Sequence, residues 1–333
     1  MKKILITGAE GFIGSHLVEK LVLKGFKVKC LVYYNSFSNL GWLDELKPSV
    51  LKKVEIVVGD VRDSDLIKNI IKDCDVIYNL AALIGIPYSY TATKSYIDTN
   101  IVGLLNILNA CKYLKIKKII HTSTSEVYGS AVSIPMKETH PLSAQSPYAA
   151  SKIGADQLAL SFFKSFNLPI TILRPFNTFG PRQSLRAVIP TIISQALNSK
   201  QKKIKIGNIK STRDFNYISD TVDAFVLAMN AKKTNGEVIN IGSGKETNIK
   251  EVLQIVINLI GVKKKILIEK RRFRPKKSEV DRLCACNKKA RLLLKWKPKR
   301  HSKTEFIKSL KKTIDWFKNY QKKKNFRPEI YHT

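Results

Sequence analysis

The chain has 333 residues, enough for one large or two closely joined domains around a buried core, and its 44% share of hydrophobic residues is ordinary for a globular protein. No apolar run approaches the roughly 18 residues that a membrane span needs, and five scattered cysteines do not suggest a disulfide framework, so we expect a cytoplasmic protein with no membrane partner. The net charge of +33 comes from lysines spread along the chain without a zinc-finger or RNA-binding motif, so we expect neither a nucleic-acid partner nor a metal site.

Short runs rich in valine and isoleucine alternate with amphipathic stretches, which is the pattern of βαβ units. The runs do not alternate strictly between apolar and polar residues, as is typical of parallel strands buried on both faces. They lie at residues 4–7, 28–33, 54–58, 76–80, 119–123, 170–173 and 238–241. The first helix is expected over 13–23, ended by Gly25. The sequence therefore predicts an α/β fold built on a doubly wound parallel sheet of the Rossmann type.

A glycine-rich loop, with glycines at 8, 11 and 14, joins the first expected strand to the first expected helix. Glycines allow a tight turn and a close approach of the backbone to a pyrophosphate, whose charge is favoured at a helix N-terminus. The predicted cofactor contacts lie in this loop and after the next strands, at Gly8, Gly11, Phe12, Ile13, Gly14, Asn35, Ser36, Asp60, Val61, Leu80, Ala81 and Ala82. The second strand ends without an acid for ribose hydroxyls and without an arginine for a 2′-phosphate, so NAD is expected and NADP stays open.

The pattern becomes irregular after Arg174, where prolines recur. We predict that residues 1–175 and about 216–241 form the dinucleotide-binding domain. Residues from about 176–215 and 242–320 are then expected to form a smaller C-terminal substrate lobe, and 321–333 a basic tail.

Tyr-x-x-x-Lys pairs begin at Tyr90, Tyr113, Tyr148 and Tyr320. The spacing places both side chains on one helix face, where the lysine charge lowers the tyrosine pKa and the tyrosine can take a hydroxyl proton. Only the pair Tyr148 and Lys152 lies at an expected helix start shortly after a strand. We therefore predict that this pair is catalytic and that both residues also contact the cofactor.

The strand before this helix is followed by Thr124-Ser125-Glu126. The Thr124 hydroxyl can hydrogen-bond the oxygen that is oxidised. The Glu126 carboxylate is more informative, because a dehydration needs a base for the C–H bond beside a new ketone, whereas simple dehydrogenation does not. We predict that these three residues complete the catalytic set; a structural glutamate is the alternative for Glu126.

Arginines on later loops, flanked by prolines and aromatic residues, are candidates to bind the substrate. They are Arg182, Arg213 and Arg274. A guanidinium group can bind phosphate through two hydrogen bonds, so we predict that some of the three hold a diphosphate. A solvated or ion-paired role is the alternative for each one.

From Thr7 to about Phe317, these motifs resemble the NAD-dependent epimerase/dehydratase family of extended short-chain dehydrogenases. The resemblance implies an enzyme that acts on a nucleotide-linked sugar. The triplet Thr124-Ser125-Glu126 resembles that of GDP-mannose 4,6-dehydratases, whereas thymidine-linked glucose dehydratases carry Thr-Asp-Glu. Ser125 stands where their aspartate serves as the acid, which leaves the acid open, and Glu126 could act as both base and acid.

Three segments, 34–43, 81–90 and 183–190, resemble the 4,6-dehydratases of bacterial legionaminic acid biosynthesis, whose substrate is GDP-N-acetylglucosamine. This resemblance implies diphosphate contacts from Asn177, Arg213 and Arg274. It places the segment that starts at Val188 near the nucleotide base, and it implies a homodimer formed by helices at about 95–111 and 148–166.

Three other functions remain as alternatives. A UDP-glucuronate decarboxylase resembles the chain at the same triplet, and a UDP-sugar 4-epimerase would share the fold and the Tyr-Lys pair without needing Glu126. The third belongs to another class: a cofactor- or nucleic-acid-binding regulator on the same fold, which could lose the Tyr-Lys pair that this chain keeps.

Overall fold

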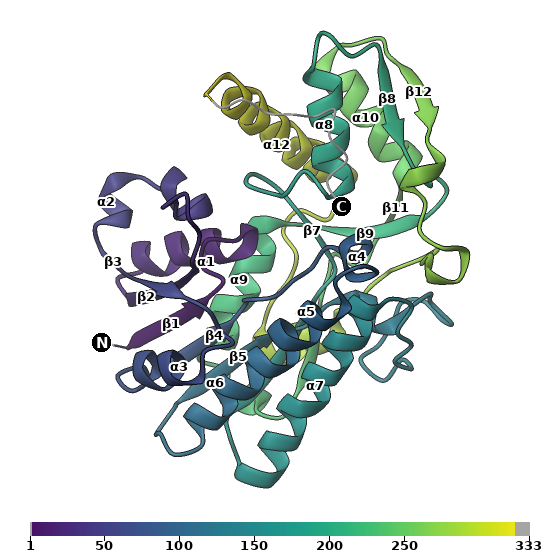
Figure 1. Ribbon diagram of the computed structural model, residues 1–333. Helices are drawn as coiled ribbons and strands as arrows, with labels where there is room; N and C mark the ends of the chain where they lie inside the picture. Colours follow the sequence, from purple (N-terminus) through teal and green to yellow (C-terminus); the bar gives the residue numbers. More distant parts are fainter. Residues whose placement is uncertain (1, 324–333) are drawn as a thin grey trace.

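The computed structural model describes residues 2–323 and is built around a seven-stranded parallel sheet (Figure 1). The spatial order of the strands is β3-β2-β1-β4-β5-β6-β10. Their bounds are β1 Lys3–Thr7, β2 Lys27–Tyr33, β3 Val54–Gly59, β4 Val76–Asn79, β5 Lys118–Thr122, β6 Ile170–Pro175 and β10 Val238–Ile241. Each bound lies within two residues of the expected run. The predicted doubly wound Rossmann sheet is therefore confirmed.

The central strand β1 explains why the apolar runs do not alternate with polar residues. Ile4, Leu5 and Ile6 are all fully buried. Ile4 and Ile6 face one apolar cluster and Leu5 faces the other, because successive side chains of a strand point to opposite faces of the sheet. A strand covered by helices on both faces has no polar position to offer.

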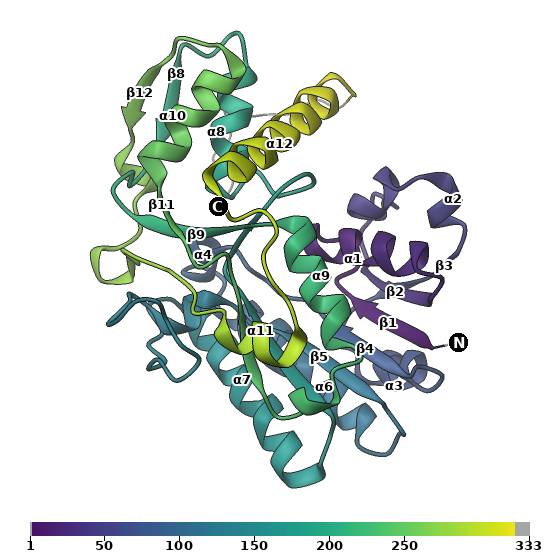
Figure 2. The same ribbon diagram turned by 180° about the vertical axis from the view of Figure 1, so that it is seen from behind.

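Helices cover both faces of the sheet, and Figure 2 shows the second face from behind. On one face lie α1 (Phe12–Leu23), α9 (Ile218–Ala228) and α11 (Lys288–Leu294). On the other lie α3 (Ser64–Ile71), α6 (Gly103–Cys111) and α7 (Pro147–Phe166). The short helix α2 (Pro48–Leu51) precedes β3, and the short helix α4 (Ile86–Ser89) precedes α5 (Thr93–Ile97). A π-helical turn over Asp98–Val102 joins α5 to α6. Helix α1 ends as predicted, with Gly25 in the left-handed region at φ +83°.

The remaining elements lie beyond the carboxyl edge of the main sheet (Figure 1). A three-stranded sheet has the order β11-β9-β7, and β8 pairs in parallel with β12. The bounds are β7 Asn177–Phe179, α8 Val188–Leu197, β8 Lys203–Ile206, β9 Thr212–Tyr217, β11 Glu246–Asn248, α10 Ile249–Ile260, β12 Lys265–Ile268 and α12 Lys303–Lys323. One apolar cluster includes Ile4 of β1, Ile192 of α8 and Phe317 of α12. The predicted division into two domains remains a prediction.

Residues 321–323 of the predicted basic tail continue helix α12, and the rest of that tail lies outside the described residues. Within residues 2–323, none of the helices combines the length and the apolar character needed to cross a membrane. The five cysteines are all buried and unpaired, as the absence of a disulfide pattern suggested.

Candidate active site

The glycine loop lies at the carboxyl edge of the sheet, beside the point between β1 and β4 where the strand order reverses. Open α/β sheets bind their ligands at such a point. Gly8 has φ +66°, and a Cβ atom there would lie 2.7 Å from the backbone nitrogen of Ala81. A Cβ atom at Gly14 would lie 2.2 Å from the carbonyl oxygen of Gly8. Gly11 precedes the first turn of α1 and no side chain caps that turn, so its N–H groups are available to an anion.

The other predicted cofactor contacts surround this loop. Phe12 and Ile13 form the first turn of α1, and Leu80 and Ala81 follow β4 directly against Gly8. Ala82 is half-buried next to them, and Val61 is buried after β3. The Asp60 carboxylate accepts two hydrogen bonds from the Arg62 side chain, at 2.9 and 2.5 Å. Burial tends to raise the pKa of Asp60, but these bonds outweigh burial and lower the pKa.

Asn35 and Ser36 follow β2 on the exposed loop between Tyr34 and Asn39. The Asn35 side chain is used within that loop: its amide group donates to the carbonyl of Asn39 at 2.9 Å, and its oxygen accepts from the Phe37 N–H at 3.1 Å. The carboxylate that reaches the end of β2 comes instead from Glu10, which accepts from the Tyr33 N–H at 3.1 Å. The sequence pattern of β2 could not reveal this acid, because it belongs to the glycine loop.

Tyr148 lies in the first turn of α7, whose N-cap is Ser146. Its side chain is buried in an apolar cluster with Ile86, and its ring packs edge-on against Tyr96 with 6.1 Å between centroids. Burial raises the pKa of Tyr148, and a hydrogen bond with Thr124 acts in the opposite direction. The site therefore holds a dry phenol beside a hydroxyl that can stabilise its deprotonated form.

Lys152 lies one turn later and is also buried. Its ammonium group donates to the carbonyl oxygen of Thr122, the last residue of β5, at 2.6 Å. Burial lowers the pKa of Lys152 to about 8. In this structure the lysine thus bonds the end of the strand, and the hydrogen bond that opposes the raised pKa of Tyr148 comes from Thr124.

A buried polar network below this pair fixes α7 on the sheet. Asp156 of α7 accepts from Ser123 at 2.6 Å and from two nitrogens of Arg174 at 3.1 and 2.9 Å. The His121 ring lies 3.5 Å from Asp156, and its other nitrogen lies 3.1 Å from the side-chain nitrogen of Asn79. Burial tends to raise the pKa of Asp156, but these partners outweigh burial and lower it. The network links β4, β5, β6 and α7, which holds the helix bearing Tyr148 in place.

Glu126 is the second residue of a 3-10 turn over Ser125–Tyr128, which follows β5. Its backbone N–H donates to the Thr124 hydroxyl at 3.3 Å, which ties the two side chains to one turn. Its carboxylate accepts a hydrogen bond from Nη1 of Arg274 at 3.1 Å. The charge of Glu126 also acts to raise the pKa of Tyr148, so the two groups are electrostatic neighbours.

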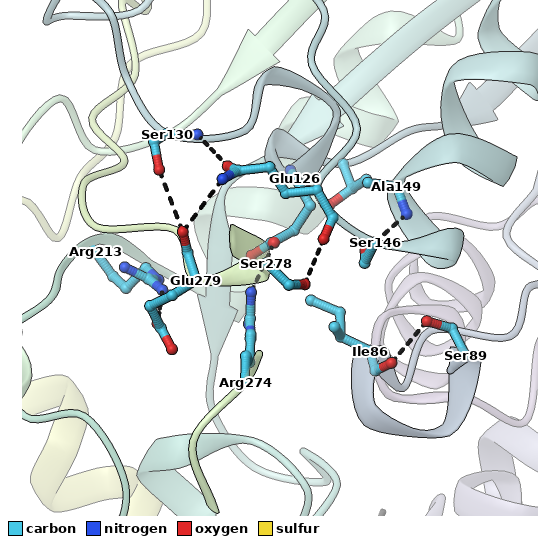
Figure 3. A network of polar contacts seen from close by, with 12 residues as sticks. Ile86, Ser89, Glu126, Ser130, Ser146, Ala149, Arg213, Arg274, Ser278 and Glu279 are labelled. Atoms are coloured by element: carbon cyan, nitrogen blue, oxygen red, sulfur yellow. Dashed lines mark hydrogen bonds and ion pairs between the residues drawn. The ribbon is translucent and has the colours of Figure 1, made fainter. Parts of the chain in front are cut away.

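Figure 3 shows the polar contacts near Glu126, with Arg274, Ser278, Glu279 and Arg213 in the same region. Arg213 of β9 is buried, and its guanidinium lies 3.8 Å from the Glu279 carboxylate. The structure thus brings two of the three predicted substrate arginines together with the predicted base. Two arginines and two glutamates thus lie together, and an anionic ligand bound to the arginines would compete with the carboxylates.

The other predicted substrate residues lie elsewhere around the site. Asn177 is on β7, in the same small sheet as Arg213. Val188 is the first residue of α8 and half-buried. Arg182 is not part of the arginine cluster: it is buried against α1, where its Nη2 donates to Glu19 at 2.9 Å.

Comparison with known proteins agrees with this geometry. The family model described as "GDP-mannose 4,6 dehydratase" matches residues 5–309. The chain belongs to the NAD-dependent epimerase/dehydratase family of extended short-chain dehydrogenases. It is 36% identical over 279 residues to a dTDP-D-glucose 4,6-dehydratase of Dictyostelium discoideum, a match that covers 78% of this chain and 62% of the relative.

Other members of the family with similar sequences or structures catalyse different reactions. A UDP-N-acetyl-α-D-glucosaminuronate decarboxylase of Bacillus cytotoxicus is 36% identical over 275 residues, which cover 80% of this chain and 83% of the relative. The UDP-glucuronic acid 4-epimerase of Bacillus cereus, solved with UDP-glucuronic acid and NAD, superposes with a TM-score of 0.85 at 31% identity and covers 96% of this chain and 99% of that one. Membership of the NAD-dependent epimerase/dehydratase family therefore establishes the class of nucleotide-sugar enzyme. Which reaction is catalysed has to be argued from the residues of the site.

Reasoning from sequence missed the hydrogen bonds that fix the segment around Arg274 in this protein. The Ser278 hydroxyl lies 2.6 Å from the Tyr90 hydroxyl and donates to the carbonyl of Gln145. The Gln145 amide group in turn donates to the carbonyl of Lys277 at 3.1 Å. These partners are 133 and 188 residues apart in the chain, and their only sequence signal was their closeness to Tyr148 or Arg274.

Proposed function

We propose that the protein is a nucleotide-sugar 4,6-dehydratase that oxidises C4 of the sugar, eliminates water across C5 and C6, and reduces C6. The observation that carries this proposal is the position of Glu126, whose carboxylate lies on the same turn as Thr124 and near Tyr148. Oxidation at C4 makes the C5 hydrogen acidic, and a carboxylate beside the oxidising group is the base that its removal requires.

NAD is the proposed cofactor. Three features suit a dinucleotide. In the glycine loop, a Cβ atom at Gly8 or Gly14 would collide with backbone atoms. The first turn of α1 has no side-chain cap, and the Glu10 carboxylate lies at the end of β2. The solved UDP-glucuronic acid 4-epimerase that resembles this chain contains NAD. Bound there, NAD would supply the hydride acceptor for the oxidation at C4 and the hydride donor for the reduction at C6, so that no cofactor would be consumed.

The residues of the chain supply proton transfer and orientation. Tyr148 removes the proton of the C4 hydroxyl, assisted by the hydrogen bond of Thr124. Lys152 supplies a positive charge on the same helix face one turn away. The apolar cluster of Ile86 and Tyr96 excludes water from the reacting atoms.

Glu126 removes the C5 proton, and the hydroxyl at C6 leaves as water. Reduction then adds a hydride to C6 and a proton from solvent to C5, which restores the C5–H bond. Ser125 is buried beside Glu126 and is a far weaker acid than the aspartate of thymidine-linked dehydratases. We therefore propose that the proton taken up by Glu126 is the one delivered to the leaving hydroxyl, so that one carboxyl group acts as base and then as acid.

GDP-N-acetylglucosamine is the proposed substrate. The support comes from the three segments that resemble the dehydratases of legionaminic acid biosynthesis. Arg213, Arg274 and Asn177 are proposed to bind the diphosphate, and the start of α8 at Val188 to contact the base. Arg182 is proposed only to support α1, since its guanidinium is paired with Glu19.

One observation favours a second function, a nucleotide-uronate decarboxylase. The Arg274 guanidinium lies 3.1 Å from Glu126, and a cation there could also receive a sugar carboxylate. The decarboxylase of Bacillus cytotoxicus is as similar in sequence as the Dictyostelium dehydratase. Only turnover can separate these two functions.

We also propose a homodimer, formed by the helices over 95–111 and 148–166. Ile97, Val102 and Phe166 expose 45%, 38% and 43% of their surface on these helices, and apolar side chains exposed on neighbouring helices are typical of an interface. Light scattering coupled to gel filtration would give twice the monomer mass; a monomer at micromolar concentration would exclude this interface.

The test of the reaction is mass spectrometry of purified protein incubated separately with GDP- and UDP-N-acetylglucosamine, without added reductant. Loss of one water from the GDP sugar alone would support both the reaction and the substrate. Loss of water from the UDP sugar alone would support the dehydration and reject guanine as the nucleotide base of the substrate. If neither changes, UDP-glucuronate is incubated next, and release of carbon dioxide would establish the decarboxylase instead.

A further inference from the structure

The two arginines proposed to bind the diphosphate are held in different ways. Arg213 is on strand β9, and its Nη1 donates to the backbone carbonyls of Thr212 at 2.8 Å and Asp281 at 3.4 Å. Arg274 is on a loop, and its Nη1 donates to the Glu126 carboxylate at 3.1 Å. The Arg274 side chain is 23% exposed and that of Arg213 only 7%. Arg213 is thus anchored by the backbone, whereas Arg274 is held by a side chain that is itself able to change partners.

The backbone around Arg274 is fastened to the rest of the site. Ser278, four residues further on, is bonded to Tyr90 of the segment after α4 and to the carbonyl of Gln145 before α7. Arg274 and Glu126 therefore face each other across a fixed frame. A change of partner needs only a rotation of the arginine side chain, not an opening of the loop.

The hydrogen bond between Arg274 and Glu126 also holds the proposed base against a positive charge. Burial lowers the pKa of Arg274, but the charges of Glu126 and Glu279 outweigh burial and raise it, so the guanidinium stays charged. A carboxylate oxygen that accepts a hydrogen bond from a guanidinium group is engaged by that bond and does not face a substrate C–H group freely. In the unliganded arrangement Oε2 of Glu126 is therefore occupied by Arg274.

We infer that Arg274 exchanges partners during substrate binding: it pairs with Glu126 in the empty site and moves to the diphosphate of the nucleotide sugar, which frees Glu126 to act as base. A diphosphate offers a doubly charged acceptor with several oxygens, which competes well against a single carboxylate. This inference rests on the proposed diphosphate site. It assigns Arg274 a positioning role on the base, in addition to its contact with substrate.

The test uses nucleoside diphosphates without a sugar, so its result does not depend on which reaction the enzyme catalyses. Dissociation constants of GDP and UDP are measured by calorimetry for the whole protein, and the tighter ligand is used for the variants. Because Glu126 competes with the ligand for Arg274, Glu126→Gln should tighten binding by about fivefold or more. Arg274→Gln should weaken binding by about tenfold, and Arg274→Lys should recover part of that loss.

The double variant separates partner exchange from a general charge effect. If Glu126 acts through Arg274, Glu126→Gln should give almost no gain in the Arg274→Gln background. Glu251→Gln on α10, which removes the same charge from an exposed pair with Lys303, is the matched control and should leave the affinity unchanged. Should Glu126→Gln fold poorly, Glu126→Asp shortens the carboxylate reach and should tighten binding to a smaller extent. An equal gain in both backgrounds, or no gain at all, would overturn the exchange.

Discussion

A buried lysine lies at each end of strand β5, one on the strand itself and one on helix α7. Lys118 is the first residue of β5, and its ammonium group donates to Ala231, Thr234 and Asn235 at 3.0, 2.9 and 2.6 Å. Lys152 lies at the other end, where it donates to the Thr122 carbonyl at 2.6 Å. Burial lowers the pKa of both lysines to about 8. The same physical cause thus shifts the pKa of both lysines in the same direction.

The difference lies in the hydrogen bonds and in the neighbours. An ammonium group has three N–H donors. Lys118 uses three on the protein, whereas Lys152 has one bond to the protein among the described residues and lies one turn from the buried phenol of Tyr148. A shifted pKa alone therefore does not identify a catalytic lysine. Lys152 differs in having N–H donors beside the phenol of Tyr148, which is the arrangement that we propose for catalysis, and the two lysines can be tested against each other.

Removing the phenol of Tyr148 should cause the largest loss of kcat, because the proposed role of Lys152 depends on that phenol. Tyr148→Phe should lower kcat by about 10³-fold, since the phenol proposed to take the C4 proton is lost. Nucleotide binding should stay within about threefold of wild type, because the change removes one oxygen. Steady-state turnover and calorimetry measure the two quantities, and turnover at a tenth of the wild-type rate would reject Tyr148 as the base for C4 oxidation.

Replacing each lysine by methionine tests the comparison directly. Lys152→Met should lower kcat by about 10²-fold, because the charge beside the phenol is lost. Lys118→Met should keep kcat within about twofold, since Lys118 lies at the amino end of the sheet. The same turnover assay measures both variants. Equal losses in the two would mean that burial of a lysine, and not its place at the site, matters for activity.

The pH dependence should follow Lys152 and not Lys118. Lys152 carries its charge below pH about 8 and loses it above, so kcat/KM should fall up to tenfold per unit as the pH rises beyond about 8. The Lys118→Met variant should show the same fall, because Lys118 does not face the substrate. A profile that stays flat to pH 9.5, or a fall that disappears in Lys118→Met, would contradict this assignment.

The smallest effect is on stability and should be shared by both lysines. A lysine whose pKa is about 8 when folded and about 10.5 when unfolded binds fewer protons in the folded state between these values. The free energy of unfolding should therefore rise between pH 8 and 10.5, by up to about 3 kcal/mol for each lysine. Urea titrations across this range should show a smaller rise in each methionine variant, and an unchanged rise would mean that the lysine is not buried as described.

The sequence was sufficient to predict the main sheet and to indicate candidate site residues that are close in the chain; their catalytic roles remain predictions. Val/Ile runs indicated all seven strands because strands buried on both faces exclude polar residues. The glycine loop, the pair Tyr148 and Lys152, and Glu126 could be predicted because each motif spans a few residues of one strand-to-helix connection. Glycine spacing and helical spacing are local properties that a single segment reveals.

What could not be predicted depends on contacts between distant segments. The pairing of Glu126 with Arg274 spans 148 residues, and no pattern around either residue indicates it. Arg182 looked like Arg213 in the sequence, yet it pairs with Glu19 of α1 because the chain after β7 passes over that helix. The role of Asn35 within its own loop was hidden for another reason: the geometry of a loop depends on backbone angles that residue types do not fix.

The most direct test of the proposed dehydration is to run the reaction in heavy water with the wild-type protein and with Glu126→Gln. A 4,6-dehydratase in which Glu126 acts on C5 should give a wild-type product that has lost one water and gained one solvent deuterium at C5, while Glu126→Gln should bind the nucleotide sugar and yield neither change. A product of unchanged mass, or a Glu126→Gln variant that eliminates water at the wild-type rate, would contradict the account.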